Sequence, residues 1–192
     1  YVLSPRLGQI SADLLEVPAV RLYHDNVLAK QAGCGRTPWH FDDHHFPLDT
    51  NDVVTAWVPA QPIPLEMGPL SFAYPLDVHE LVNSVSFEKN GTGYDRGVSE
   101  VFSKNNVKVN ETPFELGEVS FHHNLNFHTA SRNLTNRSRV VLANTYYRDG
   151  ARVINAPTMV SGDWQKFMPN VKPGDVAASP LNPICWPVKD KS

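Results

Sequence analysis

The chain has 192 residues with 17 basic and 20 acidic side chains, a length that suits one domain with a sizeable core. The net charge of −3 argues against a nucleic-acid partner or a membrane-surface partner, and no run of 18 apolar residues predicts a transmembrane helix. Cys34 and Cys185 are far apart, which argues against a disulfide framework and favours a reducing compartment, so we expect a cytoplasmic protein.

Sixteen prolines are spread along the chain and favour short strands and turns over long helices. The expected strands, in chain order, are 19–23, one beginning at 27–28, 37–42, 53–58, 70–74, 118–122, 124–129, 139–147 and 151–154. A short helix is expected to begin at Ser161 or Asp163. Many short strands separated by turns predict an all-β core with few helices, in a sandwich or barrel of the jelly-roll type.

Regular periodicity is lost between residues 77 and 112, where polar residues and glycines dominate, as in the stretch 88–93. A segment of this length without pattern is expected to run over the surface, and such loops are often functional lids. We therefore expect residues 1–192 to form a single domain, with residues 79–112 as a lid insertion.

Six of the eight histidines fall in two clusters, which is unusual for residues that are most often scattered polar groups. In the first cluster, His40 and Asp42 are two residues apart, and residues i and i+2 of a strand face the same side. With a third ligand from a distant strand they would form the two-histidine, one-carboxylate triad of non-haem Fe(II) oxygenases. The candidates for that third ligand lie about 80 residues later: His122, His123 and His128.

Arg139 favours His128 among these candidates. It begins a strand that a polar turn connects to His128, so the two strands can pair as a hairpin. An arginine on the neighbouring strand that faces the metal could bind a carboxylate through both of its nitrogens. By itself, Arg139 is equally an ordinary surface arginine at the start of a strand.

Several motifs occur in an order that resembles the phytanoyl-CoA dioxygenase family. They are Thr-Pro-Trp-His-Phe-Asp at 37–42, Ala-Trp-Val-Pro at 56–59, Gly-Pro-Leu at 68–70, Gly-Glu-Val-Ser-Phe-His-His at 117–123, and then His128, Asn133 and Arg139. The resemblance covers residues 20–147. It implies a double-stranded β-helix, which is a cupin-like jelly roll, and dependence on Fe(II) and on 2-oxoglutarate as cosubstrate.

The resemblance also implies roles for individual residues. His40, Asp42 and His128 match the iron ligands of the family. Arg139 matches the arginine that binds the distal carboxylate of 2-oxoglutarate.

Three further positions match less specific features of the family. Thr37 and Trp57 match residues that often line the cosubstrate pocket, although Trp57 fits a core aromatic on a buried strand equally well. Lys30 matches a lysine that precedes the metal motif in many members.

The chain departs from the family pattern at two places. Phe41 stands where the family commonly has glutamine, and the helical region that usually precedes the domain is expected to be missing before Tyr1. Four histidines receive no role from the resemblance: His44, His45, His122 and His123. Either they surround the metal ligands or they are solvated, and we favour solvation for the first two.

The implied reaction is hydroxylation of a C–H bond of a small-molecule or acyl substrate by O2, with release of succinate and CO2. Asp42 favours hydroxylation over halogenation, since halogenating relatives lack this ligand. No cluster of Lys and Arg suggests a site for CoA phosphates, which favours a small molecule. Two alternatives remain: a cupin-like jelly-roll binding protein without oxygenase activity, and a zinc hydrolase or isomerase that uses the same triad. A binding protein would need no dicarboxylate clamp at Arg139.

Overall fold

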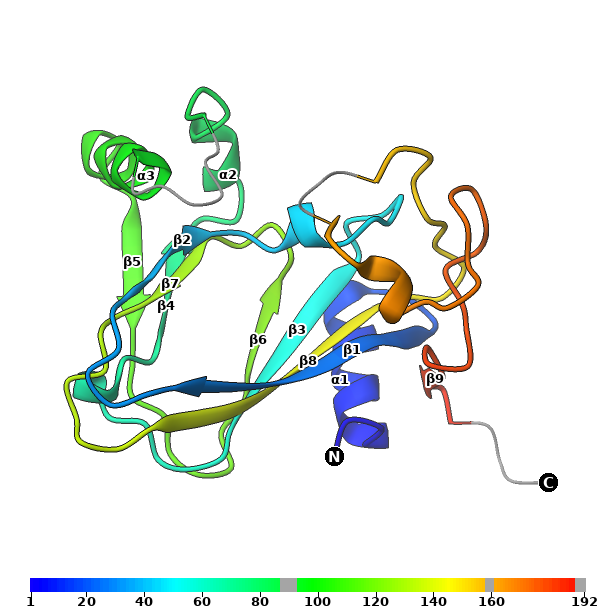
Figure 1. Cartoon of the computed structure of the whole chain (residues 1–192), viewed down its shortest axis with the longest axis horizontal. Helices are drawn as coiled ribbons and strands as arrows, with labels where there is room; N and C mark the ends of the chain where they lie inside the picture. Colours follow the sequence, from blue (N-terminus) through cyan, green and yellow to red (C-terminus); the bar gives the residue numbers. More distant parts are fainter. Residues whose placement is uncertain (87–92, 158–160, 189–192) are drawn as a thin grey trace.

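The computed structural model describes residues 1–86, 93–157 and 161–188, and its core is built from two antiparallel sheets (Figure 1). The larger sheet contains, in spatial order, β6 (Ser120–His123), β3 (Val53–Pro59), β8 (Arg139–Arg148), β1 (Val20–Lys30) and β9 (Ile184–Trp186). The smaller sheet contains β2 (Thr37–His40), β7 (His128–Ala130), β4 (Leu70–Tyr74) and β5 (Lys108–Glu111). This architecture confirms the predicted all-β core with few helices.

Strand β3, which lies between β6 and β8 in the larger sheet, is buried along its whole length because both of its faces are covered. Val54, Ala56 and Val58 pack on the side of helix α1 (Pro5–Leu15). Trp57 faces the smaller sheet, where it joins an apolar cluster that includes Leu70. This alternation follows from the two-residue period of a strand, and it leaves the space between the sheets for a site.

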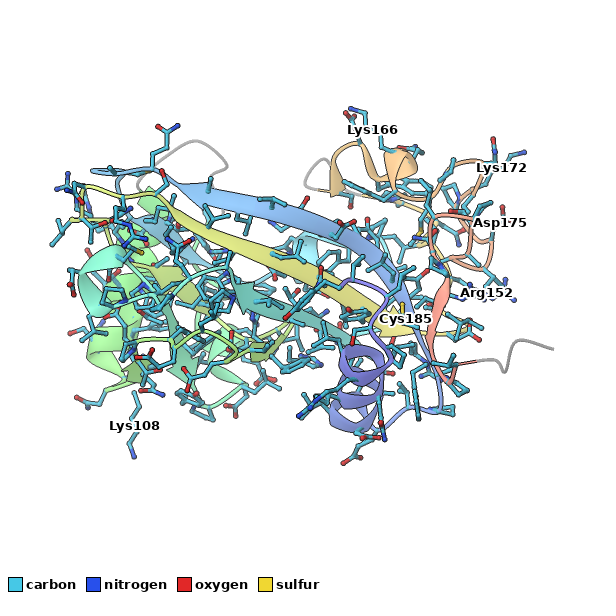
Figure 2. All side chains as sticks on the ribbon, turned by 90° about the horizontal axis from the view of Figure 1, so that it is seen from below. Lys108, Arg152, Lys166, Lys172, Asp175 and Cys185 are labelled. Carbon is cyan, nitrogen blue, oxygen red and sulfur yellow. The ribbon has the colours of Figure 1, made fainter. Side chains whose placement is uncertain are left out.

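Helix α1, which the sequence did not predict, covers the outer face of the larger sheet. Pro5 stands in its first turn, where a missing N–H costs nothing, and Leu7 and Ala12 are buried against the sheet. A Cβ at Gly8 would lie 2.5 Å from the carbonyl oxygen of Cys185, so glycine allows the helix to approach the last strand closely. Figure 2 shows Cys185 beside this helix. Both cysteines are free.

The segment 77–112 is more regular than expected, which corrects the prediction of one excursion without pattern. It contains α2 (Val78–Leu81), α3 (Gly93–Lys104) and the edge strand β5, while residues 87–92 lie outside the described part. The signal for α3 is sparse, because its three buried residues are spaced four apart in a polar background: Tyr94, Val98 and Phe102.

The helices α2 and α3 pack against the outer face of the smaller sheet, in a cluster with Trp39 and Phe127. None of the described residues of 79–112 lines the cavity between the sheets. A lid movement of this segment stays a prediction.

Other differences from the predicted elements are local. The expected strands at 19–23 and 27–28 are one strand, β1, with an irregular register between Leu22 and His24. Residues 151–154 form isolated bridges only, and the expected helix is the 3-10 turn η4 (Trp164–Lys166) after Asp163. Two more such turns are η1 (Asp43–His45) and η2 (Leu65–Met67). No helix in the described part of the chain has the length and apolar character needed to cross a bilayer.

Candidate metal centre and cosubstrate pocket

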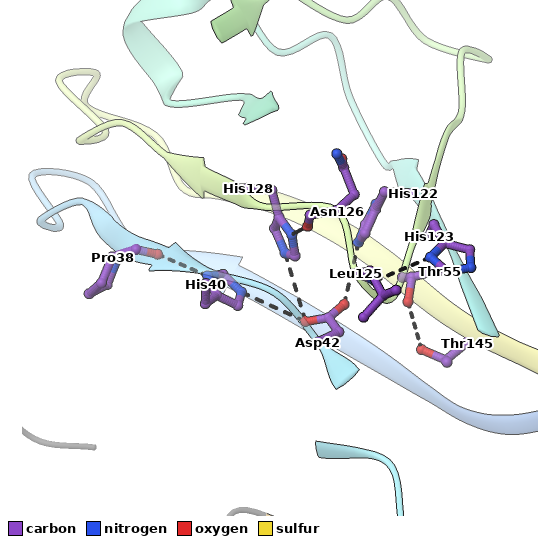
Figure 3. Close-up of polar contacts among 10 residues, drawn as sticks. All are labelled: Pro38, His40, Asp42, Thr55, His122, His123, Leu125, Asn126, His128 and Thr145. Atoms are coloured by element: carbon purple, nitrogen blue, oxygen red, sulfur yellow. Dashed lines mark hydrogen bonds and ion pairs between the residues drawn. The ribbon is translucent and has the colours of Figure 1, made fainter. Parts of the chain in front are cut away.

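Two histidines of the smaller sheet and an aspartate just beyond strand β2 converge on one point (Figure 3). His40 ends β2, His128 begins β7, and the two residues are direct partners in the strand pairing. Asp42 Oδ1 lies 3.8 Å from Nε2 of each histidine, and the three ligand atoms lie within 4.8 Å of one another. With metal–ligand bonds of about 2.1 Å, two ligands of one ion are at most about 4.2 Å apart, so both 3.8 Å separations suit a shared small cation.

Asp42 reaches this point by a different route from the one that the sequence suggested. Strand β2 ends at His40, and Asp42 has helical backbone angles, φ −86° and ψ −16°. Its backbone N–H donates to the carbonyl of Asn124 at 2.8 Å, and the Asn124 amide donates to Asp43 Oδ1 at 2.8 Å. The loop between β6 and β7 therefore positions the carboxylate, and strand alternation does not.

Backbone carbonyls orient both imidazoles. Nδ1 of His40 lies 2.8 Å from the carbonyl oxygen of Pro38, and Nδ1 of His128 lies 3.0 Å from that of Asn126. Because a carbonyl only accepts hydrogen bonds, each Nδ1 carries the proton, and each Nε2 presents a lone pair toward Asp42. Histidines that bind metals are commonly held in this way by an outer hydrogen bond.

The protonation states suit a divalent cation. Burial, together with the neighbouring His40, lowers the pKa of His128 to about 3, so its imidazole is neutral at physiological pH. Burial by itself would raise the pKa of Asp42, but His128, His122 and His40 outweigh it and hold that pKa well below its usual value. The donor set therefore includes an ionised Asp42 carboxylate and a neutral His128 imidazole.

The structure brings one of the three candidate histidines for the third position together with His40 and Asp42. His128 joins His40 and Asp42, whereas His123 faces away, and its Nδ1 accepts the backbone N–H of Leu125 at 3.3 Å. His122 lies beside the triad with Nε2 3.5 Å from Asp42 Oδ2, but it is not a member of the three-ligand group.

The triad opens into a cavity of about 370 Å³ between the sheets. The three expected cosubstrate residues all line this cavity: Thr37, Trp57 and Arg139. The structure therefore places them and the triad around one space, although they come from the strands β2, β3, β7 and β8 and, for Asp42, from the segment after β2.

One end of the cavity is positively charged. Arg139 is 5% exposed, its guanidinium lies 5.1 Å from the centre of the Trp57 ring, and Nη1 donates to the carbonyl of Gly68. Its buried Nε has no hydrogen-bond partner in the described part of the protein. Burial lowers the pKa of Arg139 to about 10, which still leaves the side chain charged at neutral pH.

Lys30 adds a second cation beside Arg139. The two residues are direct partners in the pairing of β1 with β8, and Lys30 is 6% exposed. Its Nζ donates to Thr37 Oγ1 at 3.3 Å, and burial followed by the charge of Arg139 lowers its pKa. Among the described residues, no carboxylate forms an ion pair with either side chain. Two buried cations without a protein counter-ion form a site suited to an anion.

The expected hairpin between the strands of His128 and Arg139 is wrong. Strands β7 and β8 belong to different sheets, and the chain crosses between them through a turn that Asn133 organises. The Asn133 amide donates to the carbonyls of Lys30, Gln31 and Arg137 at 3.0, 3.1 and 2.7 Å. Arg139 is consequently placed by its pairing with β1, in the other sheet from His40 and His128.

Aromatic side chains line another part of the cavity: Tyr23, Phe46 and Phe167, together with His24. The His24 ring centre lies 5.0 Å from that of Tyr23 and 4.9 Å from that of Phe167. Burial lowers the pKa of His24, which favours the neutral ring, and its buried Nδ1 has no partner among the described residues. Sequence reasoning missed this histidine, since it stands by itself on a strand.

The other two histidines of the first cluster lie on η1. His45 lines the cavity, and the His44 ring packs 4.4 Å from the ring of Phe41. Phe41 also contacts Phe127, so the residue that replaces the family's usual glutamine belongs to the apolar layer under α2 and α3. Both histidines are exposed, as expected for solvated side chains, and each also interacts with its surroundings.

Solved structures with the same fold include two enzymes described as dependent on α-ketoglutarate, which is 2-oxoglutarate. The chain is similar to the non-heme carbocyclase SnoK from nogalamycin biosynthesis, with a TM-score of 0.75 and 24% identity over 95% of this chain and 68% of that chain. It is similar to the epimerase SnoN from the same biosynthesis, with a TM-score of 0.72 and 20% identity over 96% and 70%. EctD from S. alaskensis with bound Fe matches with a TM-score of 0.62 and 16% identity over 78% and 52%.

These likenesses confirm the double-stranded β-helix.

No curated protein sequence matches the chain. The family model described as phytanoyl-CoA dioxygenase (PhyH) matches residues 2–141, which is well over half of the 192 residues. The chain therefore belongs to the phytanoyl-CoA dioxygenase family.

Proposed function

We propose that this protein is an Fe(II)- and 2-oxoglutarate-dependent oxygenase. His40, Asp42 and His128 hold the iron, and Arg139 binds the carboxylate of 2-oxoglutarate that is remote from the metal. The proposal rests on one observation. Backbone carbonyls orient the imidazoles of His40 and His128 toward the Asp42 carboxylate, in the same cavity as the buried Arg139, which has no counter-ion among the described residues. Family membership supports it, as does the neighbour SnoN, which has been solved with Fe3+ and α-ketoglutarate.

Each pocket residue has a distinct task in binding the cosubstrate. Arg139 has its Nε free for a carboxylate oxygen, while its bond to the Gly68 carbonyl fixes the direction of the guanidinium. Lys30, held on the hydroxyl of Thr37, raises the positive potential at the same end. The Trp57 ring lies against the guanidinium and covers it from one side, which keeps water away from the ion pair.

Iron held by His40, Asp42 and His128 would supply the oxygen chemistry, and three protein ligands would leave room on the ion for cosubstrate and O2. The reaction that we propose converts a substrate C–H bond, 2-oxoglutarate and O2 into the C–OH product, succinate and CO2. Hydroxylation is the simplest outcome of this chemistry. The neighbours SnoK and SnoN are a carbocyclase and an epimerase, so related folds also carry out other reactions. Chemical analysis of the product would distinguish hydroxylation from these reactions.

The lining of the cavity indicates an uncharged small molecule as the primary substrate. Of the described lining residues, Arg139 is the only Lys or Arg, and it lies at the cosubstrate end. The aromatic part offers ring faces from Tyr23, Phe46 and Phe167, with His24 as a neutral hydrogen-bonding group. Apart from Arg139, which the cosubstrate occupies, the phosphates of an acyl-CoA would find no Lys or Arg among the described lining residues.

Succinate formation tests the proposal. Protein loaded anaerobically with Fe(II) is mixed with 2-oxoglutarate and small-molecule candidates, exposed to O2, and assayed for succinate and CO2. We expect slow succinate formation without substrate and faster formation with a substrate, in proportion to oxidised product. Protein that loads iron but never binds 2-oxoglutarate would instead be a binding protein of the cupin-like kind. Turnover that persists with Zn(II) in place of iron would indicate a hydrolase or isomerase.

A further inference from the structure

His122 is the one histidine beside the triad that the proposed function does not use. It lies on β6 opposite Thr55 of β3, and its side chain is 3% exposed. Its Nε2 lies 3.5 Å from Asp42 Oδ2, while Asp42 Oδ1 is the oxygen that faces His40 and His128. The two oxygens of one carboxylate therefore have different partners, and Figure 3 shows them on opposite sides of the group.

The contact has a defined polarity. A carboxylate only accepts hydrogen bonds, so Nε2 of His122 is the group that can donate across this 3.5 Å contact. Two tilted ring contacts hold the His122 ring in place, since its centre lies 4.6 Å from that of His128 and 5.6 Å from that of Phe72. His122 is consequently fixed as a donor to the carboxylate oxygen that is turned away from the two other histidines.

We propose that His122 is a positioning residue that holds Asp42 as a one-oxygen metal ligand. This inference rests on the proposed function. A carboxylate whose second oxygen has no partner can rotate and bind the same ion through both oxygens. That second bond would occupy a position that the two-oxygen chelation by 2-oxoglutarate needs. By retaining Oδ2, His122 keeps the coordination positions open and fixes the direction of Oδ1.

The chain offers a matched set of variants. In His122→Gln, the side-chain amide nitrogen takes the place of Nε2 and can still donate to Asp42. In His122→Asn, the amide takes the place of Nδ1 and cannot reach Asp42, and His122→Leu removes the donor at similar size. His123→Leu is the control, because His123 is the next residue on β6 and its Nδ1 contacts the N–H of Leu125 instead of Asp42.

The test measures binding without turnover. Mn(II) affinity is followed by the loss of the free-ion electron paramagnetic resonance signal, and 2-oxoglutarate affinity by the charge-transfer absorption of the anaerobic Fe(II) protein. Loss of an outer partner of a metal ligand typically costs about 10- to 100-fold in metal affinity. We expect that loss for Asn and Leu, near-wild-type affinity for Gln, and no change for His123→Leu. The charge-transfer absorption should weaken in Asn and Leu and return in Gln.

Several outcomes would overturn the inference. Wild-type affinities in His122→Asn would show that the donor is not needed, and equal losses in Gln and Asn would make the imidazole itself the requirement, as a direct ligand or as packing. If His122→Leu does not fold, the comparison of Gln with Asn still decides. A wild-type protein that binds neither ion nor 2-oxoglutarate would refute the proposed function instead, so the two failures are distinguishable.

Discussion

Replacing Arg139 by alanine removes the charge that we assign to the remote carboxylate of 2-oxoglutarate. In the structure, Nη1 is already bonded to the Gly68 carbonyl, so Nε and the remaining nitrogen are available to the ligand. Hydrogen bonds to charged groups contribute about 1.5–3 kcal/mol each, and two would contribute about 3–6 kcal/mol. Lys30 remains in the variant and compensates part of the loss, so we expect a net loss of about 2–4 kcal/mol.

This loss corresponds to an increase of about 30- to 1,000-fold in the KM for 2-oxoglutarate, at about 1.4 kcal/mol per tenfold. The assay is initial succinate formation against 2-oxoglutarate concentration. Arg139→Lys should recover part of the loss, because an ammonium cannot reproduce the planar fork. Arg137→Ala is the matched control, since Arg137 is exposed in the turn before β8. An unchanged KM in Arg139→Ala, or an equal increase in Arg137→Ala, would refute the assignment of the clamp.

Two further predictions concern stability and movement. Folding lowers the pKa of His128 from 6.5 to about 3, so the unfolded chain binds the proton first as the pH decreases. The free energy of unfolding is therefore highest above pH 6.5 and decreases on acidification. At about 1.4 kcal/mol per pKa unit, the metal-free protein should lose about 2 kcal/mol between pH 7 and pH 5, measured by urea unfolding, and His128→Gln should show a smaller loss. If residues 79–112 form a lid, Fe(II) with 2-oxoglutarate should slow proteolytic cleavage of this segment. The reason is that Phe41, which stands between His40 and Asp42, packs against the apolar cluster under α2 and α3. Equal cleavage rates with and without ligands would argue against a lid.

The sequence identified most of the residues that the structure brings together, but for partly incorrect reasons. The prediction placed His40 and Asp42 on the same face of one strand. In the structure, Asp42 lies beyond the strand, and its backbone N–H donates to the carbonyl of Asn124. The residue types and their order along the chain carried the prediction. The loop that creates the geometry depends on a hydrogen bond between residues about 80 positions apart, which no local pattern shows.

Pairing between distant strands explains what the sequence could not predict. Lys30 and Arg139 become neighbours only through the register of β1 with β8. Strand alternation predicts that His122 and His123 face opposite sides, but the register of β6 with β3 decides which of them faces Asp42. The helix α3 was not predicted because most of its residues are polar. Its three buried residues are covered only because they pack against the outer face of the smaller sheet.

Equilibrium binding of Fe(II) under anaerobic conditions tests the central claim most directly. Dialysis followed by metal analysis should give a single iron per chain for the wild type. Asp42→Asn keeps the size of the side chain but removes its charge, and it should weaken iron binding at least about tenfold while the far-ultraviolet circular dichroism stays unchanged. Asp52→Asn is the control, because Asp52 pairs with Arg148 outside the cavity. Full iron content in Asp42→Asn, or an equal loss in Asp52→Asn, would contradict the assignment of the metal centre.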